Sequence, residues 1–383
     1  MDIKYFKAGK YVQQFQYKSF LPELINKEWL ISDPSVNSLL AEANLKLGEL
    51  NAFSSIVPDV NLFIRMHIVK EATTSSRIEG TRTNIDEAML KERDVDPERK
   101  DDWIEVQNYI SAMNSAVEKL SQLPISTRLI KQIHRTLMEN SRGENKLPGE
   151  FRSSQNWIGG ASIMDATFIP PQHTEINPLL SDLENFINNE VISVPHLIKI
   201  AIIHYQFETI HPFLDGNGRV GRLLITLYLV ANNLLSKPTL YLSDFFENNR
   251  QLYYDNLSIA RVNNNLTQWI KFFLSGVIST ADNGIYSFKQ ILKLRKEIEE
   301  NKIAALGKKI KLAKLTLNYL YSNPIIYSNY LTEELNITKP TAYALINDFC
   351  NLGILKEVTG RKRNKLYVFQ EYLNIFVQKR ANN

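Results

Sequence analysis

The sequence predicts a mainly α-helical protein that carries a small basic unit at its C-terminal end. Apolar residues recur at intervals of three and four over most of residues 36–304, which is the period of helices that bury one face. The segment 149–176 interrupts this pattern with a pair of glycines and a pair of prolines. After residue 304 the pattern changes to short helices and then strands. We therefore expect a helical body, one irregular insertion and a separate C-terminal unit.

The elements of the body follow from this periodicity. Residues 1–34 combine aromatic residues with prolines and are expected to form an irregular arm packed on the body. NSLLAEANLKLGEL and NLFIRMHIVKEATTSSRIEG predict two helices between Val36 and Leu90, and Gly80 is well placed to end the second. Further helices are expected at 101–121, 126–140, 176–190, 195–209, 219–235, 246–262, 266–282 and 285–304.

The insertion reads GEFRSSQNWIGGASIMDATFIPPQHTEI, from Gly149 to Ile176. A Gly-Gly pair between two strand-like pieces predicts a β-hairpin or an extended loop. A segment of this kind inside a helical domain is usually functional or mobile. The alternative is a surface hairpin of no catalytic importance.

The C-terminal unit is predicted to be a winged helix-turn-helix. Three short helices, with TKPTAYALINDFCNLG as the recognition helix, precede two strands around a Gly-Arg-Lys-Arg-Asn turn. From Lys302 onward there are 13 Lys and Arg against 5 Asp and Glu, a net charge of +8, which leaves −4 for the rest of the chain. This asymmetry suggests that the two parts of the chain have different roles. The wing carries Arg361, Lys362, Arg363 and Lys365, and it is the feature that favours DNA as a partner. A solvated basic turn, or a winged helix used for protein contacts or dimerisation, is an equally open alternative.

The bulk composition points to an ordinary soluble protein of the cytoplasm. Apolar residues make up 44% and charged residues 22% of the chain. The N-terminal stretch lacks the pattern of a signal peptide, and the richest apolar run, LLITLYLVANNLL, is too short to span a membrane. The single cysteine, Cys350, cannot form an intrachain disulfide and is expected to be a buried small hydrophobe.

The stretch HPFLDGNGRVGR, residues 211–222, lies between two apolar helices and contains a histidine, an aspartate, three glycines and two arginines. Gly216, Asn217 and Gly218 can adopt backbone angles that turn successive N–H groups into one concave nest. A helix N-terminus beside such a nest attracts anions. Arg219 and Arg222 lie on nearly one face of that helix and can bind phosphate oxygens through two hydrogen bonds each. Together these features predict a polyphosphate site.

Two further residues of this stretch suggest a reaction. Asp215 suits a phosphate site if Mg²⁺ lies between its carboxylate and the phosphates. His211 can serve as general base, with an ordinary pKa near working pH, and Phe213 is expected to anchor the loop. Taken singly, each feature is more often a turn or a hydrogen-bonded histidine, but their density in one loop favours a catalytic site.

The stretch resembles the signature of the Fic family, His-x-Phe-x-Asp/Glu-Gly-Asn-Gly-Arg-x-x-Arg. The residues that match its eight fixed positions are His211, Phe213, Asp215, Gly216, Asn217, Gly218, Arg219 and Arg222. Members of this family typically transfer AMP from ATP to a hydroxyl side chain of a target protein. The resemblance therefore implies a helical Fic core with a β-hairpin flap at 149–176, ATP and Mg²⁺ as cofactors, and a protein substrate.

The resemblance also implies a role for each matching residue. His211 would deprotonate a Ser, Thr or Tyr hydroxyl of the target or of the enzyme itself, and Asp215 would hold Mg²⁺ against the phosphates. The nest would stabilise charge developing on the α-phosphate. The residues expected to bind ATP in this stretch are Gly216, Asn217, Gly218, Arg219, Val220, Gly221 and Arg222.

A second match lies on the helix that runs up to Gly80. The residues from Ser75 to Gly80 fit the family's inhibitory pattern, Ser/Thr-x-x-x-Glu-Gly/Asn. By this resemblance Glu79 would pair with Arg222, so that ATP binds in an unproductive position and the enzyme restrains itself. Glu79 would thus belong both to the ATP site and, with Ser75 and Gly80, to an inhibitory element.

The stretch FENNRQLYYDNL is similar to the family segment that closes over the adenine. Asn248 or Asn249, and the pair Tyr253-Tyr254, are the candidates there. The alternative is that the tyrosines only pack the core, and the sequence does not choose between the two asparagines.

Sequence motifs of several other enzyme classes are absent. The sequence contains no P-loop, His-Glu-x-x-His or Gly-x-Ser-x-Gly motif, and no histidine has zinc-ligand spacing. The alternatives are a Fic enzyme that removes AMP or transfers another group, and a DNA-binding regulator with a Fic sensor core. We expect an N-terminal extension with the inhibitory helix at 1–100, a Fic core at 101–283, and a linker helix with the winged helix at 284–383. The sequence leaves open whether the chain forms a homodimer.

Overall fold

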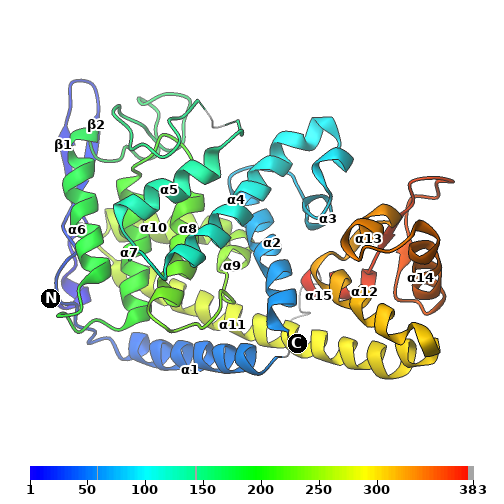
Figure 1. The fold of residues 1–383 in the computed structure, drawn as a ribbon. Helices are drawn as coiled ribbons and strands as arrows, with labels where there is room; N and C mark the ends of the chain where they lie inside the picture. Colours follow the sequence, from blue (N-terminus) through cyan, green and yellow to red (C-terminus); the bar gives the residue numbers. More distant parts are fainter. Residues whose placement is uncertain (58, 143–144, 378–383) are drawn as a thin grey trace.

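The computed structural model describes residues 1–57, 59–142 and 145–377. These residues form a mainly helical protein, as the periodicity of the sequence predicts, and they also contain two small antiparallel sheets (Figure 1). Among the described residues, no helix is long and apolar enough to cross a membrane.

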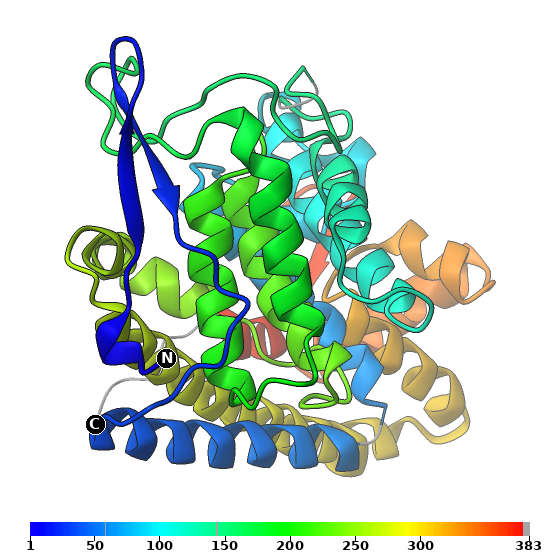
Figure 2. The same ribbon diagram turned by 90° about the vertical axis from the view of Figure 1, so that its left-hand side faces the viewer.

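The N-terminal arm contains regular structure that the sequence analysis does not predict. Strands β1 (Gly9–Gln13) and β2 (Lys18–Pro22) pair antiparallel, with Tyr11 opposite Phe20. The expectation of an irregular arm is therefore wrong at this hairpin. Its turn closes through the Gln14 N–H and the Tyr17 carbonyl, without the Asn-Gly or Asp-Gly that usually marks a hairpin. The hairpin stands beside the loops of the insertion (Figure 2).

The centre of the body consists of α7 (His196–Ile210) and α8 (Asn217–Ala231), which pack on each other. Nearly every residue of both helices is buried, and this explains their continuous apolar sequences. Helix α6 (Ile176–Asn188) packs on α7, and α4 (Lys100–Lys119) and α5 (Thr127–Met138) pack on α8. Helix α10 (Arg250–Val262) reaches α7 through Tyr253, whose hydroxyl lies 2.9 Å from Nε2 of His204. The short helix α9 (Ser243–Asn248) precedes α10, so the single helix expected at 246–262 is in fact two.

The base of the molecule is formed by α1 (Pro34–Ile56) and α11 (Leu266–Glu297), which lie side by side (Figure 1). The sequence analysis expects a break after residue 282, but α11 continues through it. Gly284 lies against Leu50 of α1, so packing favours helix at a position where glycine weakens local propensity. A π turn (Ile298–Lys302) and a 3₁₀ segment (Ile303–Lys309) follow α11.

Helix α2 (Val60–Ile78) lies between the body and the C-terminal unit. One side of α2 packs on α4, α8 and α9, and another packs on α12 and α15. His67 of α2 contacts the rings of Phe288 and Phe376, with ring centroids 5.0 and 5.1 Å away. Gly80, with φ of 102°, turns the chain just beyond the helix. The short helix α3 (Ile85–Ala88) and two 3₁₀ turns then lead to α4.

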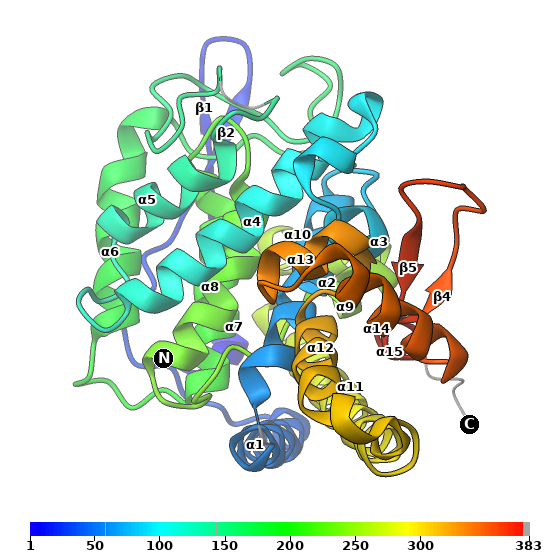
Figure 3. The same cartoon turned by 45° about the vertical axis from the view of Figure 1, so that its right-hand side comes forward.

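The C-terminal unit contains α12 (Ile310–Ser322), α13 (Ser328–Glu334), α14 (Lys339–Asn351) and α15 (Gln370–Val377). Its sheet has the order β3-β5-β4, from Ile325–Tyr327, Leu366–Val368 and Lys356–Glu357. Strand β3 and helix α15 are additions to the predicted elements. Figure 3 shows this unit beside α2 and α11, with the connection between β4 and β5 projecting outward.

Candidate active site

The loop between α7 and α8 is folded back by two residues with positive φ. His211 caps α7 with φ of 49°, and Gly216 precedes α8 with φ of 74°. The first conformation is uncommon for a residue with a side chain, and such residues are frequent at active sites. The Asn217 side chain closes the loop, because it accepts from the Phe213 N–H at 2.8 Å and donates to the Phe213 carbonyl at 2.9 Å. Asn217 can therefore offer only its backbone to a phosphate.

His134 of α5 supports the same loop and is not among the predicted site residues. Its ring stacks on Phe213 with centroids 3.7 Å apart. The Gly149 N–H donates to His134 Nδ1, so Nε2 carries the proton and donates to the Asp215 carbonyl at 3.0 Å. Burial lowers the pKa of His134 to about 4, which keeps the ring neutral in this role.

Arg152 and Asn156 hold the loop from the side of the insertion. Arg152 is buried and donates to the carbonyls of His211 and Pro171, among others. Asn156 donates to the Phe213 carbonyl at 2.9 Å. These two positioning residues were not predicted from the sequence. The polar run at residues 152–156, close to the glycine pair of the insertion, could have indicated them.

His211 is a neutral base at physiological pH. Burial lowers the pKa of His211 to about 4, although the nearby Glu79 carboxylate acts in the opposite direction. Its Nδ1 lies 3.4 Å from the Glu208 carbonyl, which leaves Nε2 as the basic nitrogen. From the sequence, His211 was expected to have the ordinary histidine pKa near working pH, but burial lowers this pKa well below that range.

Asp215 is half-exposed beside the N-terminus of α8. Its Oδ1 accepts from the Gly216 N–H at 2.6 Å and lies 3.8 Å from an Arg219 nitrogen. Within the described ranges, no three acidic, histidine or cysteine side chains are grouped so as to hold a cation. A magnesium ion here would therefore need phosphate oxygens or water for most of its coordination, which is the usual environment of Mg²⁺ at nucleotides.

Arg222 is held by the helix α2. Its side chain is 1% exposed and donates to Ser75 Oγ at 2.9 Å and to the Ser75 carbonyl at 3.0 Å. The same guanidinium donates to Glu79 Oε1 at 2.6 Å. Arg222 of the motif is thus in direct contact with Ser75 and Glu79 of the inhibitory pattern.

The Glu79 carboxylate lies directly over the start of α8. A Cβ atom on Gly218 would clash with it, so only glycine allows this approach. Burial opposes the charge of Glu79, but Arg222 outweighs this effect and lowers the pKa of Glu79. The side chain of Glu79 nevertheless remains 34% exposed. Glu79 therefore places a negative charge where the helix N-terminus would attract a phosphate.

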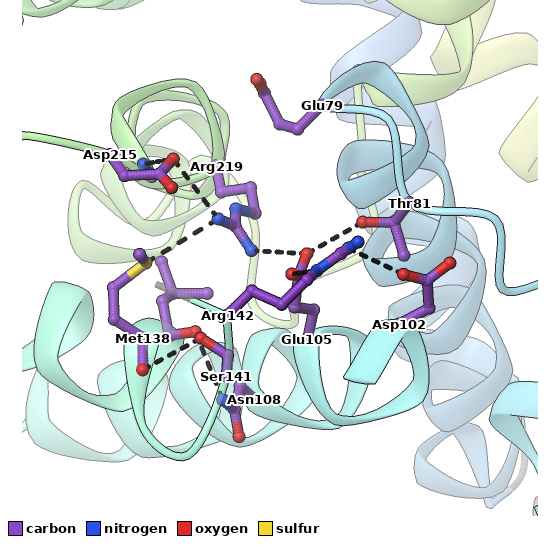
Figure 4. A network of polar contacts seen from close by, with 12 residues as sticks. Glu79, Thr81, Asp102, Glu105, Asn108, Met138, Ser141, Arg142, Asp215 and Arg219 are labelled. Atoms are coloured by element: carbon purple, nitrogen blue, oxygen red, sulfur yellow. Dashed lines mark hydrogen bonds and ion pairs between the residues drawn. The ribbon is translucent and has the colours of Figure 1, made fainter. Parts of the chain in front are cut away.

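Arg219 contacts a different acid, Glu105 of α4. The two form an ion pair at 3.2 Å, with side chains 5% and 8% exposed. Figure 4 shows Arg219 between Asp215 on one side and Glu105 on the other. Glu105 was missed in the sequence analysis, although it shares a spacing of four and seven with the buried Tyr109 and Ala112. The position of this acid on the apolar face of a predicted helix could have indicated that it is a buried, paired carboxylate.

A second missed acid, Glu208, lies near Arg222. Burial raises the pKa of Glu208 to about 8, although Arg222 acts against this effect. Its Oε1 has no hydrogen-bond partner within the described part of the chain and lies so close to Gly221 that a side chain there would clash. Val220, which was predicted to contact ATP, has a fully buried side chain and can offer only its backbone.

The segment expected to close over the adenine divides into buried and exposed residues. Tyr253 is buried and its hydroxyl lies 2.9 Å from His204 Nε2, so it packs the core. Tyr254 is 39% exposed, and Glu79 is one of the groups that raise its pKa, after burial. Asn249 donates to the carbonyl of Phe245 at 2.9 Å, while Asn248 is exposed.

The insertion is mostly an extended loop. Its only described β-pairing is the bridge between Ile158 and Phe168, so the predicted β-hairpin is present as a single pair. The loop is anchored to the N-terminal hairpin by the Phe20 N–H, which donates to the Ile169 carbonyl at 2.9 Å. Trp157 and Met164 are exposed.

Two family models match consecutive parts of the helical body. Residues 37–118 match the Fic/DOC family N-terminal domain, and residues 124–229 match the Fic/DOC family domain. A protein adenylyltransferase Fic of Drosophila erecta is 32% identical over 133 residues, which are 33% of this chain and 25% of the relative. A probable protein adenylyltransferase of Aquifex aeolicus is 32% identical over 174 residues, which are 44% of this chain and 50% of the relative. The chain thus spans a quarter to a half of these relatives.

Solved structures show a similar fold at low sequence identity. A Fic family protein from Desulfovibrio desulfuricans has a TM-score of 0.56 and 20% identity, over 90% of this chain and 98% of its own. A Fic domain containing signaling protein from Bacteroides thetaiotaomicron has a TM-score of 0.52 and 17% identity, over 67% of this chain and 97% of its own. The predicted Fic-type helical core is confirmed by these likenesses.

Proposed function

We propose that this chain, a member of the Fic/DOC family, is an autoinhibited protein adenylyltransferase. It transfers AMP from ATP to a Ser, Thr or Tyr hydroxyl of a target protein and releases pyrophosphate. The observation that carries this proposal is the convergence of His211, Asp215 and the α8 N-terminus, with Arg222 paired to Glu79. Relatives named protein adenylyltransferases support it.

In this reaction His211 removes the proton from the target hydroxyl. A neutral imidazole is required, and the lowered pKa of His211 supplies it across the physiological range. The hydroxyl oxygen then forms a bond to the α-phosphorus, while the bond to the β-phosphate bridging oxygen breaks. Pyrophosphate leaves with the electron pair.

The phosphates are bound by the start of α8 and its two arginines. Unpaired backbone N–H groups in the first turn of the helix favour the negative charge that develops on the α-phosphate. Asp215 would hold Mg²⁺, and its half-exposed carboxylate beside this turn fits an ion shared with phosphate oxygens. When bound, Mg²⁺ would supply charge neutralisation at the phosphates.

Glu79 restrains the enzyme through Arg222. While this ion pair persists, Arg222 cannot bind the γ-phosphate, and the Glu79 carboxylate repels phosphate from the space over Gly218. ATP then binds in a position from which the α-phosphate cannot be attacked in line. Removal of the carboxylate is therefore expected to activate the enzyme.

The test is transfer of label from ATP that is labelled at the α-phosphate. Glu79→Gly should increase label on the enzyme and on lysate proteins by at least about tenfold, the effect of about 1.4 kcal/mol. His211→Ala in the same background should remove this label. Unchanged labelling in Glu79→Gly at saturating ATP would contradict autoinhibition. Label from the γ-phosphate alone would indicate transfer of another group, and loss of AMP from a modified protein would indicate the reverse reaction.

The insertion is proposed to align the target. An extended loop with exposed Trp157 and Met164 beside the catalytic loop suits an extended target segment that adds by backbone hydrogen bonds. Mass spectrometry of lysate treated with Glu79→Gly and ATP would identify the modified residue. Modified sites confined to helices would contradict this mode of binding.

A second candidate function is DNA binding by a winged helix in the C-terminal unit. It is favoured by the exposure of the basic turn, where Arg361, Lys362, Arg363 and Lys365 are all exposed. Retardation of duplex DNA that weakens as salt rises, and that is lost when these four residues become glutamine, would support it. Equal retardation by the substituted chain would contradict it.

A further inference from the structure

Glu105 is a buried acid outside the sequence motif that contacts three donors at once. Its Oε2 accepts from Arg219 at 3.2 Å and from the Thr81 hydroxyl at 2.9 Å, and its Oε1 accepts from Arg142 at 3.0 Å. It stands in the second turn of α4, a helix of 20 residues that packs on α5 and α8. Its carboxylate is therefore fixed in position by the body of the protein.

Arg219 depends on this carboxylate for its orientation. One guanidinium nitrogen donates to Glu105, and the other faces Met138 Sδ at 3.7 Å and Asp215 Oδ1 at 3.8 Å. Arg219 Nε has no partner within the described residues. Glu105 at 3.2 Å is closer than Asp215, so it is the acid that sets where the guanidinium lies.

This arrangement matters for Asp215, which stands on the opposite side of the guanidinium (Figure 4). If Glu105 lost its charge, Arg219 would have Asp215 as its nearest remaining acid, since the two are already 3.8 Å apart. Asp215 would then be neutralised by Arg219 and would be a poorer ligand for a divalent cation.

We infer that Glu105 is a positioning residue that holds the Arg219 guanidinium at 3.2 Å and so limits its pairing with Asp215 to the looser contact at 3.8 Å, which keeps Asp215 available to Mg²⁺. The inference rests on the proposed function of this site in binding MgATP. It predicts that Glu105 acts on binding of the nucleotide and the metal together. A merely structural role would change the stability of the protein but not the dependence on Mg²⁺.

The test uses Glu105→Gln in the Glu79→Gly background, because glutamine keeps the shape and removes only the charge. We expect the dissociation constant of MgATP, measured by calorimetry, to rise about tenfold, the effect of losing one hydrogen bond between charged groups. The Mg²⁺ concentration that gives half-maximal ATP binding should rise as well. In an Arg219→Ala background, Glu105→Gln should change either quantity by less than about twofold, because the two residues act as one unit.

Thr81→Val is the matched control. It removes another hydrogen bond to the same carboxylate and leaves the charge and Arg219 in place. This variant should leave the Mg²⁺ dependence of ATP binding unchanged. A lowered melting temperature in Glu105→Gln with unchanged MgATP and Mg²⁺ affinity would overturn the inference. The inference would also be overturned if Glu105→Gln raised the dissociation constant of MgATP by the same factor with and without Arg219→Ala, because the two residues would then act independently.

Because binding is measured without turnover, this result is separate from the proposed reaction. If Glu79→Gly binds MgATP but transfers no label, the proposed transfer fails and the role of Glu105 is still decided by calorimetry. If Glu79→Gly transfers label and Glu105→Gln binds MgATP equally well, only the role of Glu105 fails.

Discussion

Two arginines one turn apart on α8 are each paired with a glutamate from another helix, but the two glutamates are placed very differently. Glu79 stands at the end of α2 with its side chain 34% exposed, and it makes one ion pair with Arg222. Glu105 stands within α4 with its side chain 8% exposed, and three donors surround it. An ion pair between arginine and glutamate can therefore be easily exchanged, as at Glu79, or can fix the position of the arginine, as at Glu105.

Solvation explains this difference. The half-exposed Glu79 regains much of its hydration when Arg222 is withdrawn, so little free energy is lost on the glutamate side of this pair, although Arg222 itself is buried. A buried acid has no such alternative, and removal of one partner leaves the other charge uncompensated. A phosphate group can thus compete with Glu79 for Arg222. It cannot readily compete with Glu105 for the Arg219 nitrogen that donates to Glu105.

The largest expected effect is on stability. Glu105→Ala should lower the free energy of unfolding by about 3–5 kcal/mol, because Arg219 loses its buried counter-charge. Glu79→Ala should lower it by less, because Arg222 keeps both of its Ser75 acceptors, whereas Arg219 Nε has no partner among the described residues. Urea unfolding followed by tryptophan fluorescence measures both. Equal losses would break the distinction between the two pairs.

An intermediate effect is expected on the titration of His211. Glu79 is among the groups that raise the pKa of His211, whereas Glu105 is not. The pKa of His211, about 4 in the native chain, should therefore fall further in Glu79→Gly and stay the same in Glu105→Gln. NMR titration of the histidine ring protons measures this. Because the base must be unprotonated, transfer by Glu79→Gly should not decline between pH 8 and pH 6, about the ordinary range of a histidine. A decline centred near that range would contradict the assignment.

The smallest effect is expected at Arg77, two residues before Glu79. Arg77 pairs with Glu247 at 3.2 Å, and its side chain is 42% exposed. Arg77→Ala should change the free energy of unfolding by less than about 1 kcal/mol and leave basal labelling unchanged. This variant removes a charge from the same helix end, so it is a control for Glu79→Gly. Labelling as strong as that of Glu79→Gly would show that any loosening of this end releases the enzyme.

The sequence was most informative about residues that lie close together in the chain. The stretch from His211 to Arg222 indicates the loop that we propose to be catalytic, and the resemblance to the family's inhibitory pattern led to the pairing of Glu79 with Arg222, a contact that is present in the structure. Within the stretch the residues are related by their spacing alone, whereas Glu79 and Arg222, which are far apart in the sequence, were related only by the family resemblance. The helical periodicity was reliable for the same reason.

The supporting residues could not be found in this way because they are brought in by tertiary packing. Glu105, His134 and Arg152 lie on three separate segments, and each meets the loop only in the folded chain. Packing also explains the two errors in the helices. Gly284 stays helical because it lies against α1, and Asn249 interrupts the helix expected at 246–262 with φ of −120°.

The position of α2 has a mechanical consequence. Phe63 and His67, near the start of the helix, pack on Tyr321 and Phe376 of the C-terminal unit. Beyond the other end of the helix, Lys91 pairs with Glu333 of the same unit at 2.6 Å. Glu79 therefore lies on a segment of chain that contacts the C-terminal unit both before and after it. A displacement of that unit would be passed to the Glu79–Arg222 pair through this segment and would not have to pass through the loop between α7 and α8.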